Sequence, residues 1–226
     1  MNKQSGFTLV EIAIVLVIIG LLLGGVLKGQ ELINSAKVKN LANDFRQVPL
    51  FIYGYQDKFK RLPGDDPNVG GANSRFGANV GTLATTPTGA VAGNGVIEGA
   101  WNSTTLTDES ALFWQHVRLA NLASGSTDFT NTTTASLPTN AEGGAFGIQM
   151  AIPIVGMTGS YFACSGGIPF AFAQQLDTTM DDGVGTTGTV RAVKTGTATN
   201  AAAGTPTTPV ADAYTNGNSY TVCLAF

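Results

Sequence analysis

Hydrophobic residues gather in one uninterrupted run near the start of the chain, from Phe7 to Leu27. A helix needs about 20 apolar residues to cross the hydrocarbon core of a membrane, and this run reaches that length. The short polar leader MNKQSG stands before it and carries Lys3. Because positive charge is retained in the cytoplasm, we expect a single-pass precursor whose N-terminus is cytoplasmic. A conventional secretory signal would place its small-residue cleavage site after a shorter apolar core, whereas Gly6 precedes this run.

From Lys28 onward the pattern becomes amphipathic, with apolar residues at near-helical spacing: Leu32, Ile33, Ala36, Leu41, Ala42, Phe45 and Val48. We therefore predict one helix that continues to about Phe59 and is roughly 80 Å long at 1.5 Å per residue. Gly20, Gly24 and Gly25 weaken it, and Pro49 should kink it.

The turn cluster from Arg61 to Pro67 ends the long helix, and a Gly/Asn/Thr-rich loop follows from Asn68 to Gly95. A short amphipathic helix is predicted from Ala111 to Leu122, with Asp108 or Ser110 as its cap. Alternating or apolar segments bounded by glycine predict strands at Phe146–Val155, Gly159–Cys164 and Ser219–Phe226. The segment from Thr178 to Asn218 is rich in Gly, Thr, Ala and Pro, and is predicted to be a surface loop.

Composition favours an exported protein. Charged residues make up only 12% of the chain, glycine numbers 29, and the net charge is −3, so nucleic acid is not expected as a main partner. The two cysteines, Cys164 and Cys223, fit one disulfide in an oxidising compartment, and two free buried thiols are the alternative.

One carboxylate, Glu11, interrupts the apolar run. An ionisable group at membrane depth costs on the order of 2.5–3.5 kcal/mol on insertion scales, which favours a functional role. The alternative is that Glu11 lies near the membrane interface and is merely tolerated. The residue alone does not decide between the two.

The segment Gly6-Phe7-Thr8-Leu9-Val10-Glu11, followed by an apolar helix, resembles the type III signal sequence of type IV pilins and type II secretion pseudopilins. The resemblance implies that a prepilin peptidase cuts between Gly6 and Phe7 and N-methylates Phe7. It also implies that Glu11 pairs with the Phe7 amine of a neighbouring subunit. An ion pair made only in the filament would neutralise both buried charges and set the register between helices.

The family resemblance also implies an α+β fold. Residues 1–6 would be the leader and 7–60 the long helix, of which 7–27 lie in the membrane or the filament core. Residues 61–226 would form the head, an antiparallel sheet packed on the outer half of the helix. Cys164 and Cys223 would bound a C-terminal region, with a stabilisation of roughly 4 kcal/mol by the chain-entropy model. Local melting around Gly20 to Gly25 is expected on assembly, although the proline that relatives often have there is absent.

An oxygen-rich set surrounds the segments PGDDP, GNGVIEG and TDES: Asp65, Asp66, Asn94, Glu98, Asp108 and Glu109. Calcium takes six to eight such ligands from flexible loops, and some pseudopilins bind calcium in a comparable loop. The set lacks the DxDxDG spacing, so ordinary turn-forming and capping roles are the simpler interpretation. Calcium is the one cofactor that the residues suggest.

Signs of catalysis are absent from the sequence. His116 is the only histidine and is predicted to be partly buried on the short helix, and Trp101 and Trp114 are predicted to be core residues. No GxSxG, GxGxxG after a strand, P-loop or CxxC occurs. We therefore expect a structural protein and not an enzyme.

The predicted function is a subunit of a type IV pilus-like filament, displayed on the surface and built from further copies of this chain. Its expected partners are the prepilin peptidase, an inner-membrane assembly platform and minor pilins. A minor pilin, or a type II secretion pseudopilin confined to the periplasm, is the first alternative. A membrane-anchored periplasmic binding module that never polymerises is the second, but it would have no use for Glu11.

Overall fold

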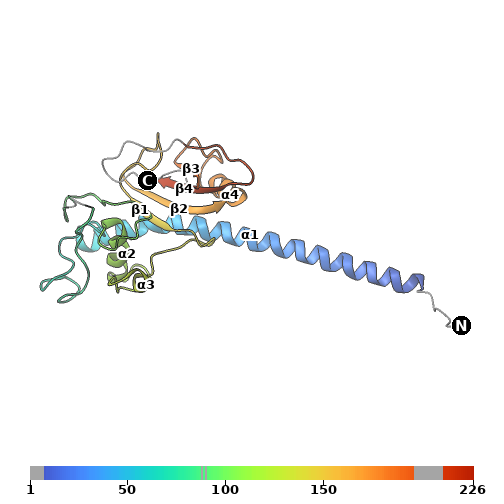
Figure 1. The fold of residues 1–226 in the computed structure, drawn as a ribbon, viewed down its shortest axis with the longest axis horizontal. Helices are drawn as coiled ribbons and strands as arrows, with labels where there is room; N and C mark the ends of the chain where they lie inside the picture. Colours follow the sequence, from blue (N-terminus) through green and yellow to red (C-terminus); the bar gives the residue numbers. More distant parts are fainter. Residues whose placement is uncertain (1–7, 88, 90, 196–210) are drawn as a thin grey trace.

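The long helix dominates the shape of the protein. The structure is a computed structural model that describes residues 8–87, 89, 91–195 and 211–226. Helix α1 (Leu9–Phe59) projects as a bare rod over its first half and carries the head on its second half (Figure 1). The head contains the helices α2 (Glu109–Leu119), α3 (Thr132–Ala135) and α4 (Phe170–Met180).

A four-stranded antiparallel sheet forms the centre of the head. Its strands are β1 (Phe146–Gln149), β2 (Phe162–Pro169), β3 (Val190–Lys194) and β4 (Ser219–Ala225), in the order β1-β2-β4-β3. The C-terminal strand therefore lies between two strands that precede it in sequence. This arrangement of long helix, antiparallel sheet and disulfide matches a type IV pilin-like α+β fold.

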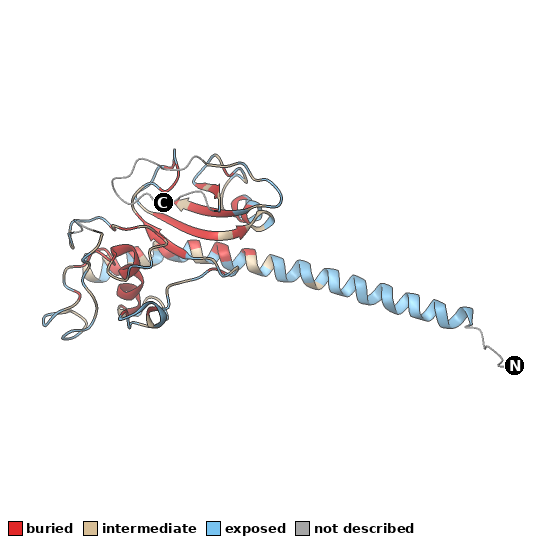
Figure 2. Ribbon diagram, in the orientation of Figure 1, coloured by how far each residue is buried: buried red, intermediate tan, exposed pale blue. Residues whose placement is uncertain are grey.

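The outer half of α1 packs on one face of the sheet because its amphipathic stripe faces the head (Figure 2). Its buried residues are Val38, Leu41, Ala42, Phe45, Val48, Ile52 and Tyr55. All of them except Tyr55 join a core with Ile148 of β1 and Val222 of β4, and the Phe45 ring meets the Phe146 ring edge-on at 5.5 Å. This layer is the main hydrophobic core.

Side chains that point to the other face of the sheet form a second, smaller core. Because successive strand residues alternate between faces, Phe162 and Cys164 lie here while Ala163 faces α1. Trp101, Ile154 and Met157 cover this face from the irregular segments. The sheet is thus covered on both faces, by α1 on one and by loops on the other.

Several predicted boundaries were wrong. The segment Thr178–Asn218 was predicted to be a loop, yet it contains strand β3, and helix α4 runs into it as far as Met180. Strand β2 extends beyond Cys164 to Pro169, with a bulge between Ser165 and Ile168. Ala192 and Val193 bury their side chains in the two cores, so packing overrode a composition that is typical of loops.

Three further local predictions concern Pro49, Asp108 and His116. Helix α1 continues through Pro49 without ending there. Asp108 occupies the N-cap position of α2 but makes no capping hydrogen bond from its side chain. His116 was predicted to be partly buried and is fully buried. The melting expected around Gly20 to Gly25 concerns the assembled filament and stays a prediction.

Candidate functional site

The first half of α1 exposes a continuous apolar surface. Large aliphatic side chains from Leu9 to Leu27 are 45–90% exposed, and the most apolar window of the helix has a mean hydropathy of 2.8. Contiguous apolar patches of this size mark contact with lipid or with other protein. By length and composition the helix is able to cross a membrane.

Glu11 closes the N-terminus of this helix. Its Oε2 accepts hydrogen bonds from the backbone N–H of Thr8 (2.8 Å) and from the Thr8 hydroxyl (2.7 Å), while the Glu11 N–H donates to Thr8 Oγ1 (3.3 Å). This reciprocal arrangement is a capping box. The spacing Thr-x-x-Glu is its sequence signature, so this cap could have been predicted from Thr8 and Glu11 alone. In a single chain, Glu11 therefore already has a role.

The predicted processing site lies outside the described residues. Gly6 and Phe7 immediately precede Thr8, the N-cap of α1. A cut between them would leave Phe7 as the first residue, next to the capping box. Cleavage between Gly6 and Phe7, methylation of Phe7 and intermolecular pairing of Glu11 stay predictions.

The two cysteines form a disulfide, and not two free thiols. Cys164 on β2 and Cys223 on β4 are cross-strand partners in the sheet, and their sulfurs are bonded. The bridge spans 59 residues in sequence and encloses α4 and β3. It therefore bounds the C-terminal region, as the family resemblance implied.

His116 joins three segments and is not placed as a metal ligand. Its Nδ1 accepts a hydrogen bond from the Gly64 N–H (2.8 Å), and its Nε2 lies 3.2 Å from the Thr82 carbonyl oxygen. Both ring nitrogens are thus engaged, with the proton on Nε2. Burial lowers the pKa of His116 to about 4, so the ring is neutral at pH 7. The histidine ties α2 to the turn that ends α1.

Three of the predicted calcium ligands are engaged in structural contacts. The Asp65 carboxylate accepts backbone N–H bonds from Gly93, from Asn94 (3.1 Å) and from Gly95 (2.7 Å). The Asp66 carboxylate accepts the Tyr55 hydroxyl (2.8 Å) and forms an ion pair with Arg75 (3.0 Å). Asp108 accepts the Ser103 hydroxyl at 2.5 Å. These contacts agree with turn-forming roles.

The other members of the set meet around Glu109. The Glu98 N–H donates to Glu109 Oε2 (2.9 Å), and the Asn94 amide donates to Glu98 Oε1 (3.0 Å). The remaining oxygens, Glu98 Oε2 and Glu109 Oε1, are buried and receive no hydrogen bond from the described residues. The pKa of Glu109 is raised to about 8, mainly because the carboxyl is buried and also because the nearby Asp65 and Glu98 carboxylates repel its negative charge. Calcium binding stays a prediction. The carboxylates of Glu98 and Glu109 are the members of the set with buried oxygens still available to bind the ion.

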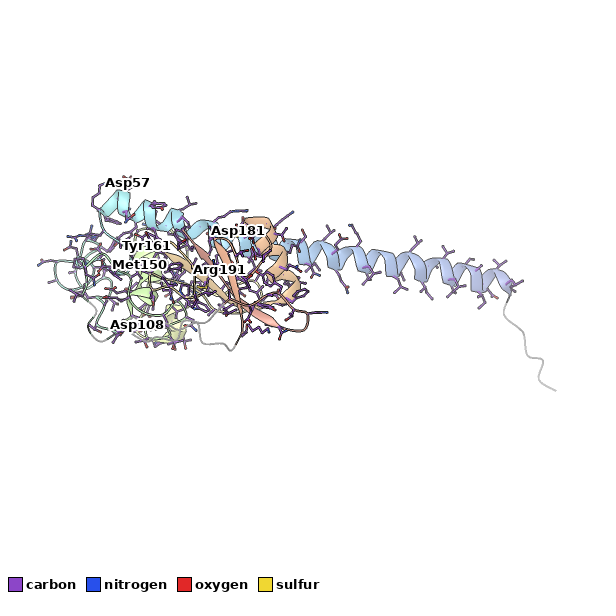
Figure 3. All side chains as sticks on the ribbon, turned by 90° about the horizontal axis from the view of Figure 1, so that it is seen from above. Asp57, Asp108, Met150, Tyr161, Asp181 and Arg191 are labelled. Atoms are coloured by element: carbon purple, nitrogen blue, oxygen red, sulfur yellow. A yellow bond between two sulfur atoms is a disulfide. The ribbon has the colours of Figure 1, made fainter. Side chains whose placement is uncertain are left out.

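A second acidic group was not found from the sequence. Asp177, Asp181 and Asp182, at the end of α4, bring one carboxylate oxygen each within 4.8 Å of one another. Asp181 is labelled in Figure 3, well apart from Asp108. Asp177 accepts the Tyr214 hydroxyl (2.8 Å), Asp181 the Val190 N–H (2.9 Å) and Asp182 the Thr187 hydroxyl (2.6 Å). These bonds anchor the α4–β3 turn.

Comparison with known proteins adds one finding at the N-terminus. Residues 1–27 match the family model described as the prokaryotic N-terminal methylation motif. No curated protein and no solved structure matches the chain. The matched residues contain the leader, Glu11 and the exposed apolar half of α1, and the motif implies processing by a prepilin peptidase. The motif and fold indicate a structural protein. The motif therefore supports a type IV pilin-like or pseudopilin precursor, and the long apolar N-terminal helix fits a membrane-anchored one.

Proposed function

We propose that the mature chain is a subunit of a type IV pilus-like filament displayed at the cell surface. The observation that carries the proposal is the exposed apolar surface of the first half of α1. This half projects from the head, and the Glu11 carboxylate caps its N-terminus. In the membrane, lipid covers this surface. In a filament, the same surfaces of neighbouring copies cover one another, with the heads outside.

Cleavage would give Glu11 a second partner. Before the cut, the Phe7 nitrogen belongs to a peptide bond and carries no charge. Hydrolysis between Gly6 and Phe7 turns it into an amine, which is a cation at neutral pH. A carboxylate and an ammonium that leave water together neutralise each other, whereas either alone is costly. Glu11 would therefore pair with a neighbour's Phe7 only after processing, so that uncut precursor stays out of the filament.

The surface pilus is favoured over the periplasmic pseudopilus by the size of the head and by its long Thr-, Asn- and Gly-rich irregular segments. The proposal includes a prepilin peptidase that cuts after Gly6, an inner-membrane assembly platform and minor pilins as partners. A pseudopilin of type II secretion would have the same helix and the same processing.

The proposal is tested on filaments sheared from cells, by the intact mass and N-terminus of the recovered protein. Long released fibres that contain chains beginning with methylated Phe7 are the expected result. The same N-terminus confined to membranes would favour a pseudopilin. Chains that still begin at Met1 in their working location would contradict the processing.

Three variants separate the two roles of Glu11. Glu11→Gln retains a side chain able to cap the helix but removes the charge, so we expect normal cleavage and filament yield lowered by about tenfold or more. Thr8→Ala removes the cap and retains the charge, and should assemble far better than Glu11→Gln. Glu11→Ala removes both. Equal yields from Glu11→Gln and the unchanged chain would eliminate the ion pair from the mechanism.

A further inference from the structure

Asp44 is a carboxylate for which the described residues provide no partner. It lies half-buried on the outer half of α1, in a groove of about 530 Å³ that is also lined by Gln47, Phe51, Trp114 and Leu122. Among the described residues, none gives it a hydrogen bond or an ion pair. Burial, the one cause, raises the pKa of Asp44 to about 6.

Arg118 lines the same groove but does not neutralise Asp44. Its guanidinium donates to the backbone carbonyls of Ser126 (2.9 Å), Ala135 (2.7 Å) and Ser136 (2.8 Å). These hydrogen bonds fix Arg118 against the segment around α3. A desolvated charge of this kind is stabilised when a mobile cation from outside reaches it.

Cations lie on the opposite flank of α1. Lys39 and Arg46 are exposed, and neither forms an ion pair within the part of the chain that the structure describes. By contrast, Lys28 pairs with Glu31 and Lys37 with Glu142.

The geometry of the helix separates these charges within one chain. At about 100° per residue, Lys39 and Arg46 lie within roughly 20° of each other, and Asp44 lies about 140–160° from both. Residues spaced two or five apart on a helix do not face each other, so Asp44 cannot pair with either cation of its own chain.

We propose that the Asp44 groove receives Arg46, with Lys39 beside it, from a second copy of this chain. The inference rests on the proposed filament. An interface repeated head-to-tail needs two different, complementary patches on one molecule, and the two flanks of α1 provide them. Arginine suits a carboxylate in such a groove because its planar fork donates two parallel hydrogen bonds.

The pairing also limits the stagger between neighbouring helices. At 1.5 Å per residue, Asp44 is about 3 Å along the axis from Arg46 and about 7.5 Å from Lys39. Parallel copies offset by up to about 8 Å along the filament would bring one of the two cations to the groove. The contact thus sets lateral packing in the outer part of the filament, where Glu11 does not reach.

Charge reversal followed by rescue tests the contact, with the yield of sheared filaments as readout. Asp44→Lys and Arg46→Glu each place like charges together, and each should lower the yield by about tenfold or more. The double variant restores opposite charges and should recover most of it. Arg61→Glu makes the same charge change on an exposed arginine beyond the helix and should leave the yield unchanged. Single variants with normal yield, or rescue of Asp44→Lys by Arg61→Glu, would overturn the assignment.

A cross-linking experiment covers the case in which a charge-reversed chain folds poorly. The double variant Asp44→Cys with Arg46→Cys should give a ladder of disulfide-linked multimers in filaments under mild oxidation, whereas each single variant should not. Filaments without a ladder would contradict the Asp44 contact and leave the proposed function intact. If the unchanged chain forms no filaments, the proposed function fails. If the double cysteine variant then gives no ladder in membranes either, the Asp44 contact is rejected as well.

Discussion

The two halves of α1 have the same secondary structure but different surroundings. In the inner half, Ile18 is 51% exposed, and its environment must come from lipid or from other copies of the chain. In the outer half, Ile52 is fully buried against the head. The head therefore gains its folding energy from only one half of the helix, and the other half is left for association.

A matched pair of truncations tests whether the two halves of α1 are energetically separate. Ile52→Ala should lower the free energy of unfolding of the head by about 2–5 kcal/mol, because a cavity replaces a packed side chain. Ile18→Ala should leave it unchanged and affect only assembly. Denaturant unfolding of the full chain in detergent, followed by tryptophan fluorescence, measures both. An equal effect of the two variants would show that the halves are not energetically separate.

Removal of the disulfide should also act on one region alone. Replacing both Cys164 and Cys223 by alanine should cost the head about 2–5 kcal/mol, since the unfolded chain loses a constraint across 59 residues. Circular dichroism at low denaturant should show that the helical signal persists while the head unfolds earlier. Loss of the entire helical signal together with the head would instead couple the two halves of α1.

The smallest expected effect concerns Glu109 and pH. Its folded-state pKa is raised to about 8 from 4.5, so the folded head binds more protons than the unfolded chain between these values. Stability is therefore highest at low pH on this account and is lost as the pH rises through 8, by at most about 1.4 kcal/mol per pH unit.

The window from about pH 7.5 to 8 isolates this effect best, because His116, with an ordinary pKa of 6.5 and a folded-state pKa of about 4, is then largely neutral in both states. Glu109→Gln should flatten the pH dependence of the unfolding midpoint in that range, and an unchanged slope would contradict the assignment. Added Ca²⁺ at pH 8 extends the test. If it raises the midpoint of the unchanged chain but not of Glu109→Gln, the calcium prediction gains support, whereas equal midpoints count against it.

Local chemistry was enough to predict the first sixty residues. The run from Phe7 to Leu27 and the amphipathic stripe around Phe45 determine a helix by composition and periodicity, which depend on neighbours in sequence. The helix observed from Leu9 to Phe59 follows from them. The motif around Glu11 is likewise contiguous. The capping box could also have been predicted from the spacing of Thr8 and Glu11.

The head was harder because its elements depend on partners that are distant in sequence. Strand β3 lies in a segment with the composition of a loop and is held by pairing with β4. The acidic residues look alike in sequence, yet Asp65 accepts backbone hydrogen bonds and Asp66 pairs with Arg75, while Glu109 Oε1 receives no hydrogen bond from the described residues. Burial separates them, and burial is a property of the folded chain.

The sequence by itself thus determined that this protein has a long apolar N-terminal helix with an N-terminal methylation motif, because those signals are local and continuous. Only the tertiary structure decided which half of that helix the head covers, which strands the disulfide joins and which charges are left unpaired. Asp44 illustrates the reason. A carboxylate on a helix is unremarkable in sequence, and it becomes a candidate contact only when folding half-buries it in a groove where no described residue supplies a cation.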